Sequence, residues 1–522
     1  MFLPRVIPTL AICMCVVNPI LSAQDTKEVK RLSLQDAIQA ALANNLAIEI
    51  QRTSWQGTKE AGTLNEESAF EWRLGASGVG RWSKSGSYSI TTFPDGDTLV
   101  AAEQVGTTYN NGRNLSASVE KAFTWGGSAQ LTYSPTYSGW SSETTYTLLD
   151  PPYNVISGDQ RSNRVPYGGS WGVSYSQNLL RGFGKKTTTA QLVIAQRGLV
   201  AADANFKKAV QDQVAVIETV YWNLVYAQMN LVNQRQSLEI ANRQLRENQI
   251  RVETGILAPI EVTSSEANVA QREVAIIQAE ANLQNAIDTF VRTVYSTTER
   301  PEEIELIDAP VVSQLNFEEG TAIENALKNR TELLTRRLDL ENAKLSEEVA
   351  QSNLKPTLNA TVGYNGSALS ASSFGPVNSD LTGFRYPGYN INLTFSMPLQ
   401  NKSARASDIR ARANRRSAEL AIRDQELAIV LDVRTAYRNL KAAEKNIVAT
   451  EKSRILAQET YDAEQMRFAN GLSTNFIVLQ RQNDLDNAKT VELNAKISYV
   501  NVQTALQQAM GTLLDYRNIA VQ

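Results

Sequence analysis

Histidine is absent from this sequence of 522 residues, and the two cysteines, Cys13 and Cys15, both lie close to the N-terminus. Because histidine is the commonest general base and metal ligand, its absence argues against a hydrolase or a metalloenzyme. The sequence also lacks a P-loop and a GxSxG motif. We therefore expect no enzyme activity, no catalytic residue, no bound metal and no cofactor.

A strong net charge and long apolar runs are missing as well. Lys and Arg number 51 against 54 Asp and Glu, and the resulting charge of −3 gives no reason to expect nucleic acid as a partner. Beyond the N-terminal segment there is no run of about 18 apolar residues, so we expect no transmembrane helix.

The N-terminal segment 1–23, MFLPRVIPTLAICMCVVNPILSA, contains one basic residue, an apolar run and a small final residue. This pattern predicts a secretory signal peptide that is cleaved after Ala23. A short anchoring helix is the alternative, but Pro8, Asn18 and Pro19 argue against it. Both cysteines lie inside the segment, so the mature chain is expected to be cysteine-free and either periplasmic, secreted or inserted in the outer membrane.

Two short stretches of the sequence echo each other. RVETGILAPIEV (251–262) and RFANGLSTNFIV (467–478) share an Arg, a four-residue step to Gly and an aliphatic stretch, and the match extends back to Tyr221 without a gap. Further upstream, LSLQDAIQAALANN (32–45) resembles EEGTAIENALKNR (318–330). Because the matched segments keep the same order, we interpret the chain as an internal duplication.

Each half is predicted to contain a helical segment, a strand region, a very long helix and a further helix, in that order. The predicted boundaries are a first repeat at 24–300 (helices 33–70, 185–251 and 259–297; β region 72–178), a linker at 301–319, and a second repeat at 320–522 (helices 320–354, 402–467 and 475–511; β region 357–397).

The long helices contain an apolar residue at every seventh position. In the first half these are Ile217, Leu224, Leu231, Leu238, Leu245 and Val252. A narrow seam of this kind favours coiled-coil packing, with an ordinary long bundle as the alternative. A helix of about 66 residues spans roughly 100 Å, which matches two of the shorter helices end to end. We therefore expect the two turns to lie together at one end of these helices and the strands at the other.

The strand regions alternate apolar and small polar residues, as in GYNINLTFSMPL (388–399). This pattern predicts a membrane barrel with a wet lumen, and a soluble sheet with one buried face is the alternative. The second β region holds only two strands, too few to close a barrel, so we expect a homo-oligomer. Stretches rich in Ser, Gly, Asn and Thr (84–112, 138–168 and 366–386) are interpreted as long exposed loops. Residues 115–134 are predicted to form an additional hairpin with a turn at Gly126-Gly127.

The duplicated halves, LLRGFG (179–184), YWNL (221–224) and the two turns together resemble the TolC-type outer-membrane efflux protein family. The resemblance implies a homotrimer in which each protomer gives about four strands to one outer-membrane β-barrel. The additional hairpin at 115–134 has no equivalent in the second half, and it would either extend the strands above the membrane or enter the barrel wall. A long periplasmic α-helical coiled-coil tunnel would continue this barrel, making an α+β membrane protein. Members of the family are passive exit ducts of tripartite pumps and type I secretion systems, and they meet a periplasmic adaptor linked to an inner-membrane pump.

By the same resemblance, the turns dock the adaptor. The candidate docking residues are Arg251, Gly255, Ile256, Leu257, Arg467, Gly471 and Leu472. A purely structural role is the alternative, in which each Gly ends a helix and each Arg is a solvated cation near the helix C-terminus.

The gate departs from the family pattern. Phe468 and Ser473 replace a Tyr and an Arg that help to close the gate of the best-known member, and Ile477 and Gln480 occupy the positions of its acidic ring. Glu261 keeps a carboxylate at the matching position, and Gln480 with Asp484, one helical turn later, is the candidate constriction.

A trimeric coiled-coil adhesin or structural rod of the cell surface is the alternative function. It would explain the heptads, but it would not require duplicated halves with alternating strands. The leading expectation is therefore a conduit in the outer membrane of a Gram-negative bacterium, with a large periplasmic part and outer-membrane lipid around its strands.

Overall fold

The computed structural model describes residues 30–95, 98–148, 158–164, 166–299, 304–311 and 318–520. The predicted signal peptide and about half of the predicted linker (301–303 and 312–317) lie outside these residues. The chain divides into two compact units, each built from three stretches. The first unit comprises Met1–Leu46, Val214–Gln314 and Ala442–Gln503, and the second comprises Ala47–Gln213, Leu315–Lys441 and Thr504–Gln522. Each unit therefore takes segments from both predicted repeats.

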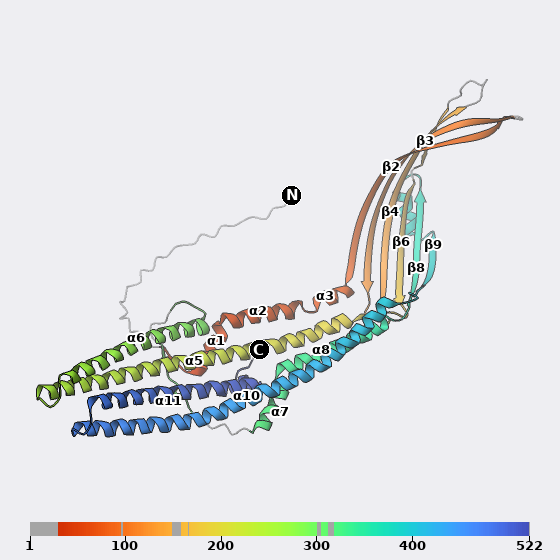
Figure 1. Ribbon diagram of the computed structural model, residues 1–522. Coiled ribbons are helices and arrows are strands. Elements are labelled where there is room, and N and C mark those ends of the chain that lie inside the picture. The colour runs from red at the N-terminus through yellow and green to blue at the C-terminus, as the bar shows by residue number, and fades with distance from the viewer. Residues whose placement is uncertain are drawn as a thin grey trace, which may run out of the picture. The chain divides into compact units, whose positions relative to one another are not determined.

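Four long helices dominate the helical part of the described chain. Helix α5 (Ala190–Glu253) has 64 residues and α10 (Lys402–Ala469) has 68, whereas α6 (Ile260–Tyr295) and α11 (Asn475–Met510) have 36 each. Figure 1 shows α5 beside α6, and α10 beside α11, each pair joined by a tight turn. None of the helices in the described ranges combines the length and apolar character needed to cross a bilayer.

The predicted helical segments at 33–70 and 320–354 are interrupted in the structure. The first forms α1 (Leu34–Asn44), α2 (Leu46–Ala61), α3 (Leu64–Glu67) and a 3-10 turn at Ser68–Phe70. The second forms α7 (Glu319–Asn329) and α8 (Thr331–Ser352).

The breaks after α1 and α7 have the same geometry. Asn45 and Arg330 are both extended, with ψ of 117° and 118°, and each donates its backbone N–H to the carbonyl four residues earlier. The Asn45 side chain also donates to the Thr293 carbonyl at 2.5 Å, and this long-range bond holds the break in place. Such a contact is not visible in local sequence, which is why one continuous helix was predicted.

A buried tyrosine fixes the start of α1. Tyr221 is fully buried on α5, and its hydroxyl lies 3.0 Å from the Asp308 carboxylate and 3.2 Å from the Leu32 carbonyl. Asp308 also accepts from the Leu34 backbone N–H at 2.6 Å. Burial, together with the Asp308 charge, raises the pKa of Tyr221, so the hydroxyl remains a donor. Nearby, β1 (Lys30–Leu32) pairs in parallel with β7 (Ile304–Leu306).

The described part of the second unit contains an antiparallel sheet with strand order β2-β3-β4-β6-β8-β9. The strands are β2 (Trp72–Asp95), β3 (Thr98–Ala122), β4 (Gly127–Leu148), β6 (Tyr167–Asn178), β8 (Thr357–Ser370) and β9 (Pro387–Ser396). A seventh strand, β5 (Gly158–Arg164), pairs with the far end of β4. The predicted hairpin at 115–134 is the β3–β4 connection, where Gly126 has a φ of +92°, and it belongs to the same sheet as the other strands.

The predicted loops at 84–112, 138–168 and 366–386 are largely wrong. Residues 84–95 and 98–112 pair with each other as the outer parts of β2 and β3. Much of 138–168 continues β4 or forms β5 and β6, and helix α9 (Phe374–Thr382) lies inside 366–386. Small polar residues suggested turns, but continuous backbone pairing satisfies the main chain, whatever the side chains are.

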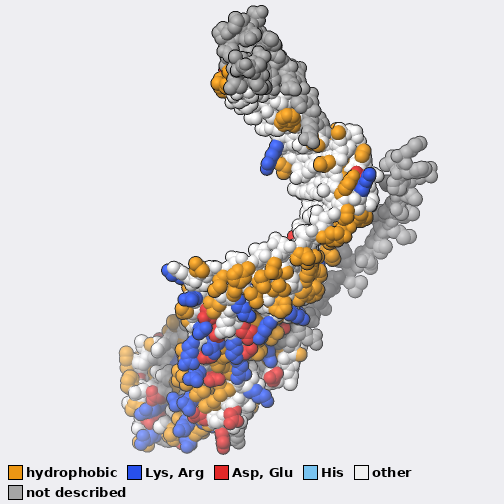
Figure 2. All heavy atoms as spheres, turned by 90° about the vertical axis from the view of Figure 1, so that its right-hand side faces the viewer, with side chains coloured by type: hydrophobic (Ala, Val, Ile, Leu, Met, Phe, Trp, Pro, Cys, Tyr) orange, Lys and Arg blue, Asp and Glu red, His pale blue; other side chains and the backbone are white. Residues whose placement is uncertain are grey.

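The core lies in the helices. Among the described residues, the largest fully buried side chains are Tyr221, Tyr499, Phe290, Ile217, Leu224, Leu333, Ile429, Leu440, Leu485, Leu506, Met510 and Leu513, and all are helical. On the face shown in Figure 2, charged side chains are dense over the helices and sparse over the strands.

Candidate functional site

The two turns at the ends of α5 and α10 have the same backbone geometry, and both lie in the first unit. Gly255 and Gly471 have φ of +76° and +75°. Gly255 donates to the Val252 carbonyl at 2.9 Å, and Ile256 donates to the Arg251 carbonyl at 2.8 Å. This pair of bonds is a Schellman motif, in which a left-handed residue ends the helix.

The second turn repeats these bonds residue for residue. Gly471 donates to the Phe468 carbonyl at 3.1 Å, and Leu472 donates to the Arg467 carbonyl at 2.9 Å. The Arg-x-x-x-Gly-aliphatic echo in the sequence is therefore a repeated C-cap. Each Arg supplies a carbonyl that accepts from the chain after the turn, and each Gly supplies the positive φ.

The aliphatic residues after the glycines are exposed. In many Schellman motifs this residue packs back onto the last helical turn. Here Ile256 and Leu472 are 73 % and 77 % exposed. The helices that precede them therefore do not bury these two apolar side chains.

Four more exposed apolar residues lie around the two turns. With Ile256 and Leu472 they form two equivalent sets at the spacing of 216 residues, which we call the apolar triplets: Ile250, Ile256 and Ile260 at the first turn, and Met466, Leu472 and Phe476 at the second. The sequence analysis missed Ile250, Ile260, Met466 and Phe476. The sequence does contain a signal for these four residues: at the repeat spacing, each apolar position that flanks one glycine has an apolar equivalent beside the other.

The two turns contact each other through Arg251. Its guanidinium donates to the Phe468 carbonyl at 3.2 Å and lies 4.7 Å from the centroid of the Phe468 ring. Leu257 packs against the cluster of Tyr461, Phe468, Val478 and Leu485. Arg467 differs, because its side chain is 67 % exposed and lies 3.6 Å from the Glu464 carboxylate. The equivalent arginines therefore have unequal surroundings: one joins the turns and the other faces solvent.

A buried polar network lies one to two helical turns away from the glycines. The Asn248 amide donates to Ser265 Oγ and to Asn475 Oδ1, both at 2.8 Å. Asn475 in turn donates to Ser265 Oγ at 3.2 Å and to the Glu261 carbonyl at 3.4 Å. These bonds tie α5, α6 and α11 together, and because the network is satisfied it specifies one packing of the three helices.

The gate candidates do not form a cluster in this chain. Glu261 is half-buried and uses its backbone carbonyl in the asparagine network. Gln480 and Asp484 are exposed, one turn apart on the side of α11 that faces away from buried Val478 and Leu485. Asp484 pairs with Arg481 at 3.0 Å. Among the described residues, no hydrogen bond or ion pair joins Glu261 to Gln480 or Asp484.

A buried ion pair lies further along the same helices. Arg272 of α6 and Asp486 of α11 are 2.9 Å apart, and each is at least 90 % buried. Ser237 of α5 donates to Asp486 at 2.6 Å, and Arg272 also reaches Asn483. The sequence analysis did not find this pair, because its members occupy non-equivalent places in the two repeats.

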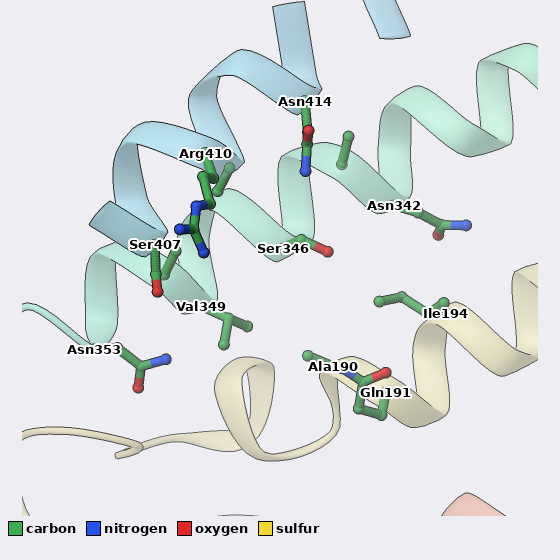
Figure 3. A pocket seen from close by; sticks show the side chains of 13 residues that line it. Ala190, Gln191, Ile194, Asn342, Ser346, Val349, Asn353, Ser407, Arg410 and Asn414 are labelled. Carbon is green, nitrogen blue, oxygen red and sulfur yellow. The ribbon is translucent and has the colours of Figure 1, made fainter. Parts of the chain in front are cut away.

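A separate cavity of about 580 Å³ lies in the second unit between α5, α8 and α10. Figure 3 shows Ala190 and Ile194 from α5, Ser346 and Val349 from α8, and Arg410 from α10 around it. Its lining offers one cation, some amides and small side chains. Across the described part of the chain, no group of three His, Cys, Asp or Glu side chains is arranged to hold a metal ion.

A family model described as "Outer membrane efflux protein" matches residues 163–292 and 322–512, together more than half of the chain. This chain belongs to the outer membrane efflux protein family. Outer membrane protein TolC of Vibrio cholerae serotype O1 is 24 % identical over 386 residues, which cover 70 % of this chain and 83 % of that protein. Outer membrane protein TolC of Escherichia coli K12 is 24 % identical over 339 residues, which cover 62 % of this chain and 66 % of that protein.

Solved structures share the fold of this efflux protein. The Campylobacter jejuni CmeC outer membrane channel superposes with a TM-score of 0.59 at 14 % identity, covering 97 % of this chain and 94 % of that one. The open state of the Neisseria gonorrhoeae MtrE outer membrane channel gives 0.60 at 15 % identity, covering 92 % and 89 %. Family membership makes the protein an efflux channel of the Gram-negative outer membrane. The alternative of an adhesin or structural rod has no support among these relatives.

Proposed function

We propose that this efflux protein is the exit duct of a tripartite pump or of a type I secretion system. It forms a homotrimer that conducts substrates passively from the periplasm to the exterior, without catalysis or cofactor. Outer-membrane lipid surrounds its sheet, and an inner-membrane pump supplies the energy. The two turns dock a periplasmic adaptor protein and contain the gate.

The apolar triplets carry the docking proposal. Exposed apolar groups beside polar surface are typical of a protein contact site. Two equivalent sets, 216 residues apart in the sequence, suit a partner that presents the same helical surface more than once. Gly255 and Gly471 set the direction of each turn, while Ile256, Leu257 and Leu472 supply contact area. Arg251 supports the docking surface by joining the two turns, and the exposed Arg467 adds a positive charge to that surface.

The double variant Ile256→Ser/Leu472→Ser tests the docking surface. We expect adaptor capture and export to fall at least tenfold while the outer-membrane trimer remains, because the substitutions alter exposed side chains only. Ile277→Ser is the matched control: Ile277 is 67 % exposed on α6 but lies outside the triplets. Equal export by the double variant, the control and the parent would contradict docking at the turns.

Glu261, Gln480 and Asp484 are proposed as gate and lumen residues. The support is that Gln480 and Asp484 share one exposed face of α11 close to the turn, where a three-fold assembly would repeat them around an axis. Gln480→Lys should shift single-channel ion selectivity toward anions, and Asp484→Asn should shift it in the same direction but less. If neither variant changes the reversal potential, these residues do not line the constriction.

We also propose that the chain is an internal duplication, with repeats at 24–300 and 320–522, and that its long helices pack as a coiled coil. Helices α6 and α11 have equal lengths, and the capping geometry recurs at both turns. The heptad seam is fully buried at Ile217 and Leu224, as a coiled coil requires. Toward the turn, Leu245 is only half-buried and Gln244 is buried in its place, so the fully buried apolar seam does not extend to the turn.

A further inference from the structure

The β3–β4 hairpin lies in the middle of the sheet. β3 pairs with β2 on one side and with β4 on the other, and β4 pairs with β6 along Gly127–Tyr137. The free edges belong to β2 and β9. The hairpin therefore separates β2 from β6 by two strands, rather than extending outward from a smaller sheet.

Cross-strand register shows that the hairpin shares the faces of its neighbours. One row of paired residues runs across all six strands: Leu74, Val119, Leu131, Val173, Tyr364 and Tyr389. The next row on the opposite face is Gly75, Ser118, Thr132, Gly172, Asn365 and Gly388. The first row is apolar throughout, and the second contains only glycine and small polar residues. This is the alternation of a wall with lipid on one side and water on the other.

The hairpin turn carries a second mark of a membrane wall. The rings of Phe123 and Trp125 stack with centroids 4.5 Å apart, and the Trp125 indole donates to the Tyr175 hydroxyl at 2.9 Å. Lys121 lies 5.6 Å from the ring of Trp72. An aromatic girdle with a nearby lysine is typical of the headgroup level of a barrel, and short turns are typical of its periplasmic side. Only four residues separate β3 from β4.

The end of the sheet at this turn is the end from which the helices leave. Asn178, the last residue of β6, donates its backbone N–H to the Gly126 carbonyl at 3.5 Å. The chain then enters α4 (Lys185–Thr188) and α5. The β3–β4 hairpin thus spans the same part of the sheet as β6, with its turn at the end from which the helices leave.

We propose that each protomer gives six strands to the membrane wall, so that three copies close a barrel of 18 strands by pairing β9 of one copy with β2 of the next. This rests on the proposed trimer. In a six-strand antiparallel path the two edge strands run in opposite directions, so the new pair is also antiparallel. The ten residues of β9 match the length that spans a bilayer.

Six strands per protomer would make the outer exit of the barrel wider. A resemblance to the family implies four strands per protomer and 12 in the trimer. Barrel diameter grows roughly linearly with strand number, so the wall proposed here is about 1.5 times wider. The outer exit then imposes less restriction on cargo, and the helix turns remain the narrow part.

Electron microscopy of the wild-type protein in lipid nanodiscs tests the proposal by counting strands. A three-fold barrel with 18 strands, including the β3–β4 hairpins, is expected. A three-fold barrel with 12 strands and the hairpins outside the wall would overturn this inference and leave the proposed conduit intact. A particle without a three-fold closed barrel would overturn both.

Single cysteines in intact cells give an independent measurement, because the parent has no cysteine after Cys15. Leu131→Cys should react at least tenfold more slowly with a membrane-impermeant maleimide than Thr132→Cys, which faces the lumen. Val173→Cys on β6 is the control, because β6 belongs to the wall whether each protomer gives four strands or six, and Val173 faces the lipid in both cases. Fast labelling at Leu131→Cys but slow labelling at Val173→Cys would exclude the hairpin from the wall.

Discussion

The sheet and the paired helix turns solve opposite packing problems. In the sheet, large apolar side chains such as Leu74 and Tyr389 are about four-fifths exposed. At the turns, polar Asn248 and Asn475 are essentially fully buried, whereas apolar Leu472 is exposed. Neither region follows the simple rule of apolar residues inside and polar residues outside. Each leaves apolar surface for something other than this chain.

The form of the exposed surface separates the two roles. Across the sheet, apolar residues form a continuous row over six strands, from Leu74 to Tyr389, as a fluid lipid phase requires. At the turns they form two small sets beside Arg467 and the glycines, as a discrete protein partner requires. The buried polar groups at the turns fix helix packing together with the apolar cluster of Tyr461, Phe468, Val478 and Leu485.

The largest effect is expected from breaking the buried ion pair. Arg272→Met leaves the Asp486 carboxylate buried without its cation, which should destabilise the helical unit by about 3–5 kcal/mol. Thermal and denaturant unfolding of the purified protein measures the loss. Arg481→Met is the matched control, because its partner Asp484 is half exposed, and it should change stability by less than about 1 kcal/mol. The double variant Arg272→Met/Asp486→Leu should recover most of the loss; no recovery would argue that the pair acts through other contacts.

A charge on the apolar face of the sheet should have the next largest effect. Val173→Arg places a guanidinium in the middle row of that face, with a cost of about 2–4 kcal/mol if lipid lies there. Ser174→Arg, one residue away on the polar face, should be nearly neutral. Folding into lipid vesicles, followed by urea titration, gives both values. Equal destabilisation by the two variants would mean that the two faces do not differ in solvent.

The sequence predicted the turns better than the sheet. The spacing from Arg to Gly is local, because a Schellman motif is closed by bonds within six residues, and both motifs were found. The strands β2 and β3 were partly read as loops, because their outer parts are rich in Ser, Gly and Thr and lack clear alternation. Their pairing depends on backbone register, which composition does not encode.

Long-range contacts explain the remaining differences. Asn475 and Asn248 are 227 residues apart, so the buried network that joins them has no local signature. The roles of Gln480 and Asp484 depend on neighbouring copies of the chain, and therefore stay predictions. The apolar triplets were accessible in principle, since Ile260 and Phe476 occupy equivalent repeat positions, but a motif search centred on glycine did not reach them.

Substitution of the turn glycines should have an intermediate effect. A Cβ at Gly255 or Gly471 would meet no atom within 4 Å, so the whole penalty is conformational. Gly471→Val should cost about 1–2 kcal/mol or more, because a β-branched residue disfavours the positive φ. Gly198→Ala in α5 is the control; it also has open space but no positive φ, and should stabilise by roughly 0.5–1 kcal/mol. A neutral Gly471→Val variant would show that the turn opens in solution.

The smallest effect should come from Arg251→Lys, and it tests whether the two equivalent arginines differ. The lysine keeps the charge but loses the cation–π contact of the guanidinium with the Phe468 ring and the geometry of the bond to the Phe468 carbonyl, which should cost about 0.5–1 kcal/mol. Arg467→Lys should leave stability unchanged, because its exposed side chain has only a long contact to Glu464. The denaturation midpoints of the two purified variants give the comparison. Equal shifts would mean that both arginines act alike, whereas a shift at Arg251 alone would mean that the duplicated motif has divided into one residue that joins the turns and one left free for a partner.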